Sequence, residues 1–91
     1  MVDIMKIGGI TGWLSAMGQA EAASLPVSSH LFVETSAHVL PITPTAHWLE
    51  YLDIAGSLLA EKPLVVDGSL TALGPGLGMC WDEDAVRRYA A

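Results

Sequence analysis

The chain opens with a short apolar run, a pair of glycines and a segment whose apolar residues recur at three- and four-residue spacing. Residues 2–7 (VDIMKI) predict a strand, which Gly8-Gly9 would end. The spacing then predicts a helix that is capped by Thr11 and ends near Ser24. Its apolar face would comprise Ile10, Trp13, Leu14, Met17 and Ala20.

A second strand and a second helix follow. Residues 25–28 (LPVS) predict a short strand, in which a proline near the start is tolerated. A strand, a helix and a strand joined by a crossover of this length form a βαβ unit, so we expect parallel strands and a right-handed connection. Residues 34–40 predict a shorter helix, which Pro41 would stop.

The run HWLEYLDIAGSLLA, residues 47–60, is ambiguous. Its apolar positions fit an amphipathic helix, and a buried strand over residues 48–51, broken before Gly56, fits as well. The preceding alternation of strands and helices favours the strand. Two βα units followed by a third strand indicate an α/β protein.

The pattern changes from residue 62 onward. A hairpin turning on Asp67-Gly68 is predicted, followed by a glycine-rich loop at residues 74–78 that lacks the lysine of a phosphate-binding loop. Asp82 is predicted to cap a final helix that runs to Tyr89.

Composition and charge limit the classes of partner. The chain has 91 residues, of which 52% are hydrophobic, and this is more apolar material than one small domain hides, so we expect surfaces that contact other protein. A net charge of -6 with only four Lys and Arg residues argues against a nucleic-acid partner. No apolar run reaches the ~20 residues of a membrane span, and the first residues lack the features of a signal peptide. We therefore expect no membrane partner and a cytoplasmic location.

Three ionisable side chains fall on the three predicted strands. Neighbouring parallel strands would bring Asp3, His30 and Glu50 to one rim of the sheet, where a carboxylate beside an imidazole fixes its tautomer and makes it a better base. The apolar neighbours of Glu50 should raise its pKa, and a protonated carboxyl group can donate a hydrogen bond to an oxyanion. Other interpretations remain open: a loop position for His30, an ion pair between Asp3 and Lys6, and a solvent-facing position for Glu50.

Several motifs add a resemblance to these residues. MKIGGITGW, PVSSHLF, TPTAHWLEYLD and PGLG, with WDEDAV after it, closely resemble the C-terminal portion of the mandelate racemase/muconate lactonizing enzyme family of the enolase superfamily. The resemblance covers essentially the whole chain. It implies the last three β/α units of a TIM-type (β/α) barrel, incomplete here, over residues 1–61. Residues 62–91 would form a C-terminal tail that returns to the capping domain.

The resemblance also implies roles for particular residues. His30 looks like the general base that removes the proton α to a carboxylate, Asp3 like its hydrogen-bonded partner, and Glu50 like the acid that stabilises the enediolate. Leu31 and Leu52 would line the substrate pocket. Members of the family use Mg²⁺, but their metal ligands and a second, lysine base lie on earlier strands. This chain therefore has no metal ligands of its own and should be inactive alone.

Two hypotheses follow from the resemblance. In the first, the chain works with a missing N-terminal portion as part of a magnesium-dependent racemase acting on a 2-hydroxy carboxylic acid, or of an acid-sugar dehydratase. The TPTAHWLE motif favours the racemase. In the second, it is a non-catalytic fragment that forms a homo-oligomer, because the exposed edges of an open sheet must be covered.

Overall fold

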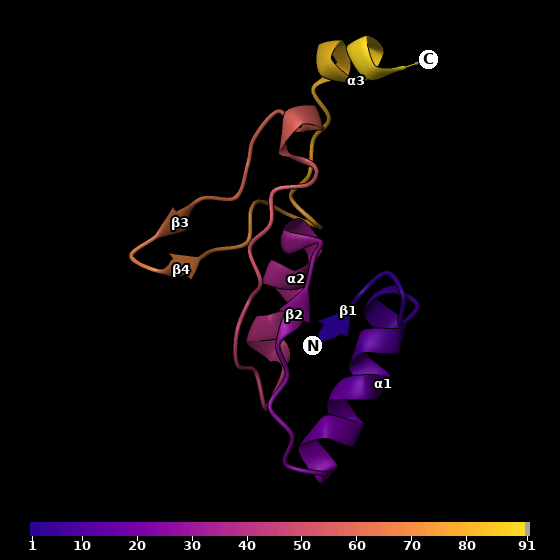
Figure 1. Ribbon diagram of the computed structural model, residues 1–91, viewed down its shortest axis with the longest axis vertical. Coiled ribbons are helices and arrows are strands. Elements are labelled where there is room, and N and C mark those ends of the chain that lie inside the picture. Colours follow the sequence, from indigo (N-terminus) through magenta and orange to yellow (C-terminus); the bar gives the residue numbers. More distant parts are fainter. Residues whose placement is uncertain (91) are drawn as a thin grey trace.

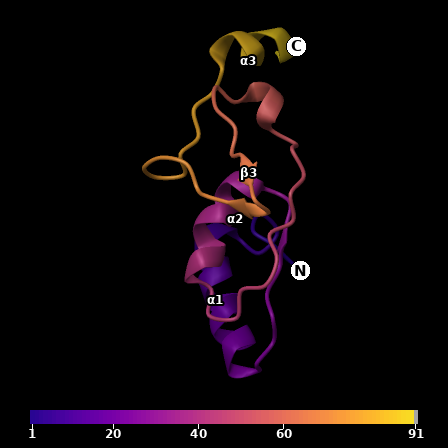
Figure 2. The same cartoon turned by 90° about the vertical axis from the view of Figure 1, so that its left-hand side faces the viewer.

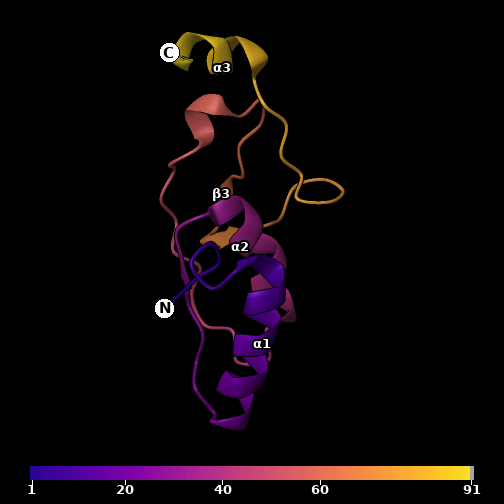
Figure 3. The same ribbon diagram turned by 90° about the vertical axis from the view of Figure 1, so that its right-hand side faces the viewer.

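The structure, a computed structural model that describes residues 1–90, is elongated, with principal extents of 46 × 31 × 22 Å. Two helices, α1 and α2, and two strands, β1 and β2, form one end, while the C-terminal tail extends away from them to α3 at the other end (Figure 1). The loop between β4 and α3 projects sideways from the tail, as Figures 2 and 3 show.

The first strand is shorter than the sequence predicted. β1 covers only Val2–Asp3, because the Asp3 carboxylate turns the chain. Its Oδ1 atom accepts hydrogen bonds from the backbone N–H groups of Met5, at 2.9 Å, and Lys6, at 3.1 Å. A short polar side chain that binds the backbone two or three residues ahead favours a turn over an extended strand. The prediction of a strand over residues 2–7 is therefore wrong beyond Asp3.

Helix α1 spans Gly9–Ala22 and begins before the predicted cap at Thr11. Gly8 occupies the cap position with a φ of 93°, a left-handed conformation that glycine adopts without steric cost. The predicted apolar face is divided. Trp13 and Met17 are buried, whereas Ile10 and Leu14 are exposed.

The second strand, β2, covers Ser29–His30 and pairs in parallel with β1. The predicted parallel arrangement is therefore confirmed, but the strand lies further along the chain, because β2 begins at Ser29, directly after the predicted residues 25–28. Helix α2 then spans Val33–Val39 and continues into a 3-10 turn at Leu40–Ile42.

The segment that follows runs beside β2 without forming a regular strand. The N–H group of His47 donates to the carbonyl of Val27 at 2.8 Å, and Ser29 donates to the carbonyl of Trp48 at 2.9 Å, one residue further than a regular parallel ladder would place it. The next donor, the N–H group of Glu50, is bound by the Ser29 hydroxyl at 3.1 Å. This slip explains why the predicted strand over residues 48–51 is absent there, and the helical alternative is absent as well.

The core lies between α1, the segment that leads into β2, and the end of α2. The buried members of its main cluster are Ile4, Trp13, Met17, Val27, Val39 and Leu40. Thr43 closes the cluster, since its hydroxyl accepts from Trp13 Nε1 at 3.0 Å and lies 2.8 Å from the Val39 carbonyl.

The tail matches its predicted elements. Strands β3 (Val65–Val66) and β4 (Ser69–Leu70) form an antiparallel hairpin, whose turn residues Asp67 and Gly68 both have positive φ, as a tight hairpin requires. After a 3-10 turn at Gly56–Leu58 and the glycine-rich loop, α3 spans Glu83–Tyr89. The Asp82 carboxylate caps α3 by accepting the N–H group of Ala85 at 3.0 Å.

Large apolar side chains are exposed along much of the chain. Trp48 is 68% exposed and Trp81 is 55% exposed. Exposed aromatic side chains of this size are typical of surfaces that pack against further polypeptide. No helix in the described part of the chain is long and apolar enough to cross a membrane.

Candidate active site

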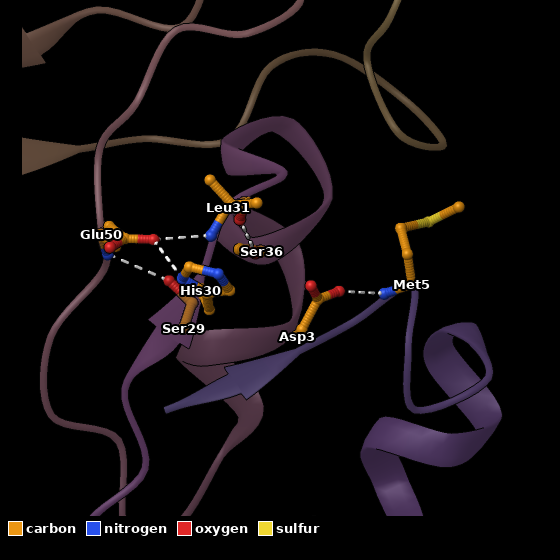
Figure 4. Close-up of polar contacts among 7 residues, drawn as sticks. All are labelled: Asp3, Met5, Ser29, His30, Leu31, Ser36 and Glu50. Carbon is orange, nitrogen blue, oxygen red and sulfur yellow. Dashed lines mark hydrogen bonds and ion pairs between the residues drawn. The ribbon is translucent and has the colours of Figure 1, made fainter.

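The parallel pairing of β1 with β2 and the segment beside β2 gather the three predicted site residues in one neighbourhood. Asp3 and His30 are partners in the register of the sheet. Glu50 reaches the same place from the other side of β2, where Ser29 holds its backbone. In Figure 4 the His30 ring is drawn between the carboxylates of Glu50 and Asp3.

Glu50 makes the direct contact with the histidine. Its Oε2 atom lies 2.7 Å from His30 Nδ1 and also accepts the N–H group of Leu31 at 2.8 Å. The two side chains are 40% (His30) and 34% (Glu50) exposed, so the pair lies at the surface of this chain. One oxygen atom thus anchors both the ring and the backbone that follows it.

The pKa of Glu50 moves in the opposite direction to the one predicted from its apolar neighbours. The hydrogen bond from the Leu31 N–H group is the main cause that lowers the pKa, and the hydrogen bond and charge of His30 lower it further. Desolvation raises the pKa but does not outweigh these interactions. The prediction of a raised pKa is therefore wrong for this geometry, in which Glu50 is an ionised acceptor at neutral pH.

Asp3 makes local hydrogen bonds rather than one to the histidine. Both of its hydrogen bonds go to Oδ1, from Met5 and Lys6, and within residues 1–90 its Oδ2 atom has no hydrogen-bond partner. No ion pair with Lys6 forms within this range either. The hydrogen-bonded pair of Asp3 and His30 stays a prediction.

The backbone directly after His30 is strained. Leu31 and Phe32 have φ values of 54° and 46°, in the left-handed region that non-glycine residues rarely occupy. The two peptide units that meet at Leu31 are both bound: Glu50 accepts the Leu31 N–H group, and the Ser36 hydroxyl donates to the Leu31 carbonyl at 3.0 Å. Backbone strain that is held by surrounding hydrogen bonds is typical of active sites, where a side chain must keep one orientation.

Two buried serines belong to the site, and the sequence reasoning did not assign them this role. Ser29 and Ser36 are both fully buried, and their hydroxyls bind the backbone of Glu50 and of Leu31. The available signal was a serine on the face of α2 that is otherwise occupied by Val33 and Ala37. A hydroxyl at a buried helical position requires a hydrogen-bond partner.

The predicted substrate-contacting residues differ in their surroundings. Leu31 follows His30 directly and is half-buried, while Leu52 is 52% exposed on the extended segment after Glu50. Their role as a pocket lining stays a prediction.

A family model, enolase C-terminal domain-like, matches residues 1–85 of the chain. The chain belongs to this family. The match includes all three candidate residues and most of the tail, and it confirms the resemblance drawn from the sequence motifs.

Solved structures of enolase superfamily members are similar to the chain. An enolase from Bradyrhizobium, crystallised with magnesium and mandelic acid, is 62% identical, with a TM-score of 0.97 over 100% of this chain and 25% of the relative. An enolase from alpha proteobacterium bal199 with bound magnesium is 47% identical, with a TM-score of 0.91 over 94% of this chain and 24% of the relative. The L-talarate dehydratase from Polaromonas sp. JS666, crystallised with magnesium and L-glucarate, is 28% identical, with a TM-score of 0.86 over 96% of this chain and 25% of the relative. The chain therefore spans about a quarter of the length of these relatives.

The magnesium seen with these enolase superfamily members lacks a matching set of ligands here. Across residues 1–90, no three His, Cys, Asp or Glu side chains cluster in a way that could hold a metal ion. Mg²⁺ prefers an octahedral shell of oxygen atoms, of which proteins usually supply one or more carboxylates and water the rest. Asp3 and Glu50 lie on opposite sides of an imidazole and bind backbone N–H groups, so they do not fit such a site.

Proposed function

We propose that this chain supplies the proton-transferring histidine of an enolase superfamily enzyme that removes the proton α to the carboxylate of a 2-hydroxy acid. The observation that carries the proposal is the position of His30 at the end of β2, with Nδ1 held 2.7 Å from Glu50 and Asp3 as its register partner. Identity of 62% with an enolase crystallised with magnesium and mandelic acid supports this substrate class.

The contact with Glu50 determines which nitrogen of the ring is available. A neutral imidazole carries one N–H group, and the carboxylate at Nδ1 selects the tautomer in which Nδ1 donates. Nε2 is then an unprotonated acceptor. His30 is therefore prepared to accept a proton at Nε2 from a substrate bound on that side.

The two carboxylates have separate roles when substrate binds. A substrate carboxylate placed beside Glu50 adds a like charge, which raises the pKa of Glu50 and favours its protonated form. Protonated Glu50 can donate a hydrogen bond to the developing enediolate, as predicted from the sequence resemblance. Glu50 is then a weaker acceptor for the ring, and Asp3 is the carboxylate whose negative charge remains beside His30.

The rest of the site would come from polypeptide outside this chain. In this proposal residues 1–61 form the last three β/α units of a TIM-type barrel and residues 62–91 return to the cap. The parallel pair of β1 and β2 and the exposed apolar side chains support it. The second base, and the ligands of the magnesium seen with relatives, would lie on the other strands. We use the term full-length protein for the complete enzyme of this proposal, in which the present chain is the C-terminal part.

We favour racemisation over dehydration. Both reactions begin with the same α-proton, and they differ in whether a hydroxyl group then leaves. The identity of 62% with the enolase crystallised with mandelic acid, against 28% with the dehydratase crystallised with L-glucarate, supports the racemase.

The test is proton exchange with solvent. The full-length protein with magnesium is incubated with mandelate in D₂O, and loss of the α-proton and change of chirality are followed by NMR and polarimetry. We expect His30→Asn to slow exchange by at least about 100-fold, the range typical of a lost general base. His47→Asn is the matched control, because His47 is exposed and its ring contacts that of Trp48 in a tilted arrangement, with the ring centroids 5.0 Å apart, outside the site.

Wild-type rates in a folded His30→Asn protein would contradict the proposal. Exchange with mandelate but no change in its chirality, together with loss of water from galactarate or glucarate, would favour the dehydratase instead.

A further inference from the structure

The strained peptides after His30 depend on contacts from outside their own segment. Leu31 and Phe32 hold left-handed conformations with φ of 54° and 46°, which are unfavourable for residues with a side chain. The surroundings must supply compensating bonds. For Leu31 these bonds come from Glu50 on one side and Ser36 on the other.

Ser36 connects this strained segment to the core. It lies in the first turn of α2, its N–H group donates to the Phe32 carbonyl at 2.9 Å, and its hydroxyl donates to the Leu31 carbonyl at 3.0 Å. The side chain is fully buried, and its neighbours on the helix, Val33 and Ala37, are buried as well. The hydroxyl thus fixes the carbonyl of the Leu31–Phe32 peptide relative to helix α2.

The backbone conformation of Leu31 determines where Glu50 can bind. The Leu31 N–H group and His30 Nδ1 both contact the same Oε2 atom, at 2.8 and 2.7 Å. The carbonyl that Ser36 holds and this N–H group lie in the two peptide units that meet at the Leu31 Cα, where φ is 54°. A change in the Leu31 backbone angles would therefore turn one unit against the other and move the N–H group away from this oxygen. Glu50 would then lose its backbone anchor and could no longer hold the ring in one orientation.

We propose that Ser36 is a positioning residue for His30, acting through the Leu31 peptide and Glu50. This inference rests on the proposed function, in which His30 is the base. It assigns to a buried serine that contacts neither the ring nor the carboxylate a part in the rate of proton transfer.

The first test is structural and needs no substrate. A crystal structure of the full-length Ser36→Ala protein should show Leu31 or Phe32 outside the left-handed region and a longer separation between the Leu31 nitrogen and Glu50. If both residues keep their conformation and the Leu31–Glu50 bond is unchanged, the inference is overturned.

The second test is kinetic. Because a shift of about 1 Å in a reacting group costs up to about 100-fold in rate, we expect Ser36→Ala to lower kcat for α-proton exchange by about 10–100-fold with little change in KM. Thr43→Val is the matched control, since Thr43 is also buried and its hydroxyl also contacts a helix carbonyl, that of Val39 at 2.8 Å. It should lower the stability of the fold and leave kcat unchanged.

The outcomes separate the two proposals. An unchanged kcat in Ser36→Ala, with His30→Asn inactive, would show that Ser36 is structural only. Exchange that survives in His30→Asn would instead refute the proposed function, and the crystal structure would still decide whether Ser36 holds the Leu31–Glu50 contact.

Discussion

Substitution of Asp3 tests the proposed mechanism directly, because the two carboxylate oxygens of Asp3 have different roles in it. Oδ1 accepts the N–H groups of Met5 and Lys6 and shapes the turn that ends β1. Oδ2 has no hydrogen-bond partner within residues 1–90, and in the proposed mechanism its charge stabilises the imidazolium once Glu50 is protonated. Asp3→Asn retains an oxygen for the turn and removes the charge. Asp3→Ala removes both functions.

The hydrogen bonds of Asp3 allow the effects of the two substitutions on stability and on catalysis to be estimated. Each hydrogen bond contributes about 0.5–1.5 kcal/mol, and the two at Asp3 lie at an exposed turn, so Asp3→Ala should lower the free energy of unfolding by about 1–2 kcal/mol. Asp3→Asn should change it by less than about 0.5 kcal/mol, because the amide oxygen can accept both bonds. Its effect on catalysis should nevertheless be large, about 100-fold or more in kcat, since a neutral amide does not stabilise the charged imidazole.

The two quantities are measured on the same full-length proteins, by urea denaturation and by exchange of the mandelate α-proton in D₂O. Asp3→Asn with wild-type stability and strongly reduced kcat is the expected result. Wild-type kcat in Asp3→Asn would refute the assignment of Oδ2 to His30 and leave Asp3 as a turn residue. A loss of stability equal to that of Asp3→Ala would refute the turn argument.

Two further predictions concern Glu50 and helix α1. The fold lowers the pKa of Glu50 from 4.5, so the ionised carboxylate stabilises the fold above that pH, and this contribution is lost as the pH falls through the lowered pKa. Glu50→Gln should therefore weaken the dependence of the urea midpoint on pH in the acidic range. An unchanged dependence would contradict the hydrogen bonds described for Glu50. Gly12→Ala should destabilise the fold by about 1–3 kcal/mol, because an added Cβ would overlap the Ile7 carbonyl. Gly18→Ala in the same helix meets nothing within 4 Å and should stabilise it by up to about 1 kcal/mol, so equal effects of the two substitutions on thermal unfolding would disprove the packing argument.

Local sequence signals predicted helix α1, the hairpin and helix α3. The three- and four-residue spacing around Trp13 and Met17 located α1, and the turn chemistry of Asp67-Gly68 and the cap at Asp82 located the hairpin and α3. These signals are local and involve the backbone conformations that particular residues favour. The parallel pairing followed from the length of the crossover.

The sequence pattern was insufficient where one side chain replaces a backbone partner. Apolar periodicity extended the first strand to residue 7, because it does not register the two hydrogen bonds that Asp3 makes to the turn. It also predicted a strand over residues 48–51, where the Ser29 hydroxyl binds Glu50 in place of a carbonyl. The raised pKa expected for Glu50 was wrong for the same reason. Its neighbours in sequence are apolar, but its neighbour in space is the Leu31 N–H group.

In the proposed mechanism Glu50 takes up a proton, and its use of a single oxygen atom as acceptor would keep the backbone of the site in place when it does. Glu50 Oε2 accepts both the Leu31 N–H group and His30 Nδ1, whereas within residues 1–90 its Oε1 atom makes no hydrogen bond. A proton added at Oε1 leaves Oε2 able to accept from Leu31, so the strained peptide and Ser36 keep their positions. The attraction between Glu50 and an imidazolium is lost, however, because the carboxyl group is then neutral. In the proposed mechanism, proton uptake at Glu50 therefore preserves the backbone of the site and changes only which carboxylate stabilises the charged ring. Asp3, the register partner of His30 in the sheet, would then take that role.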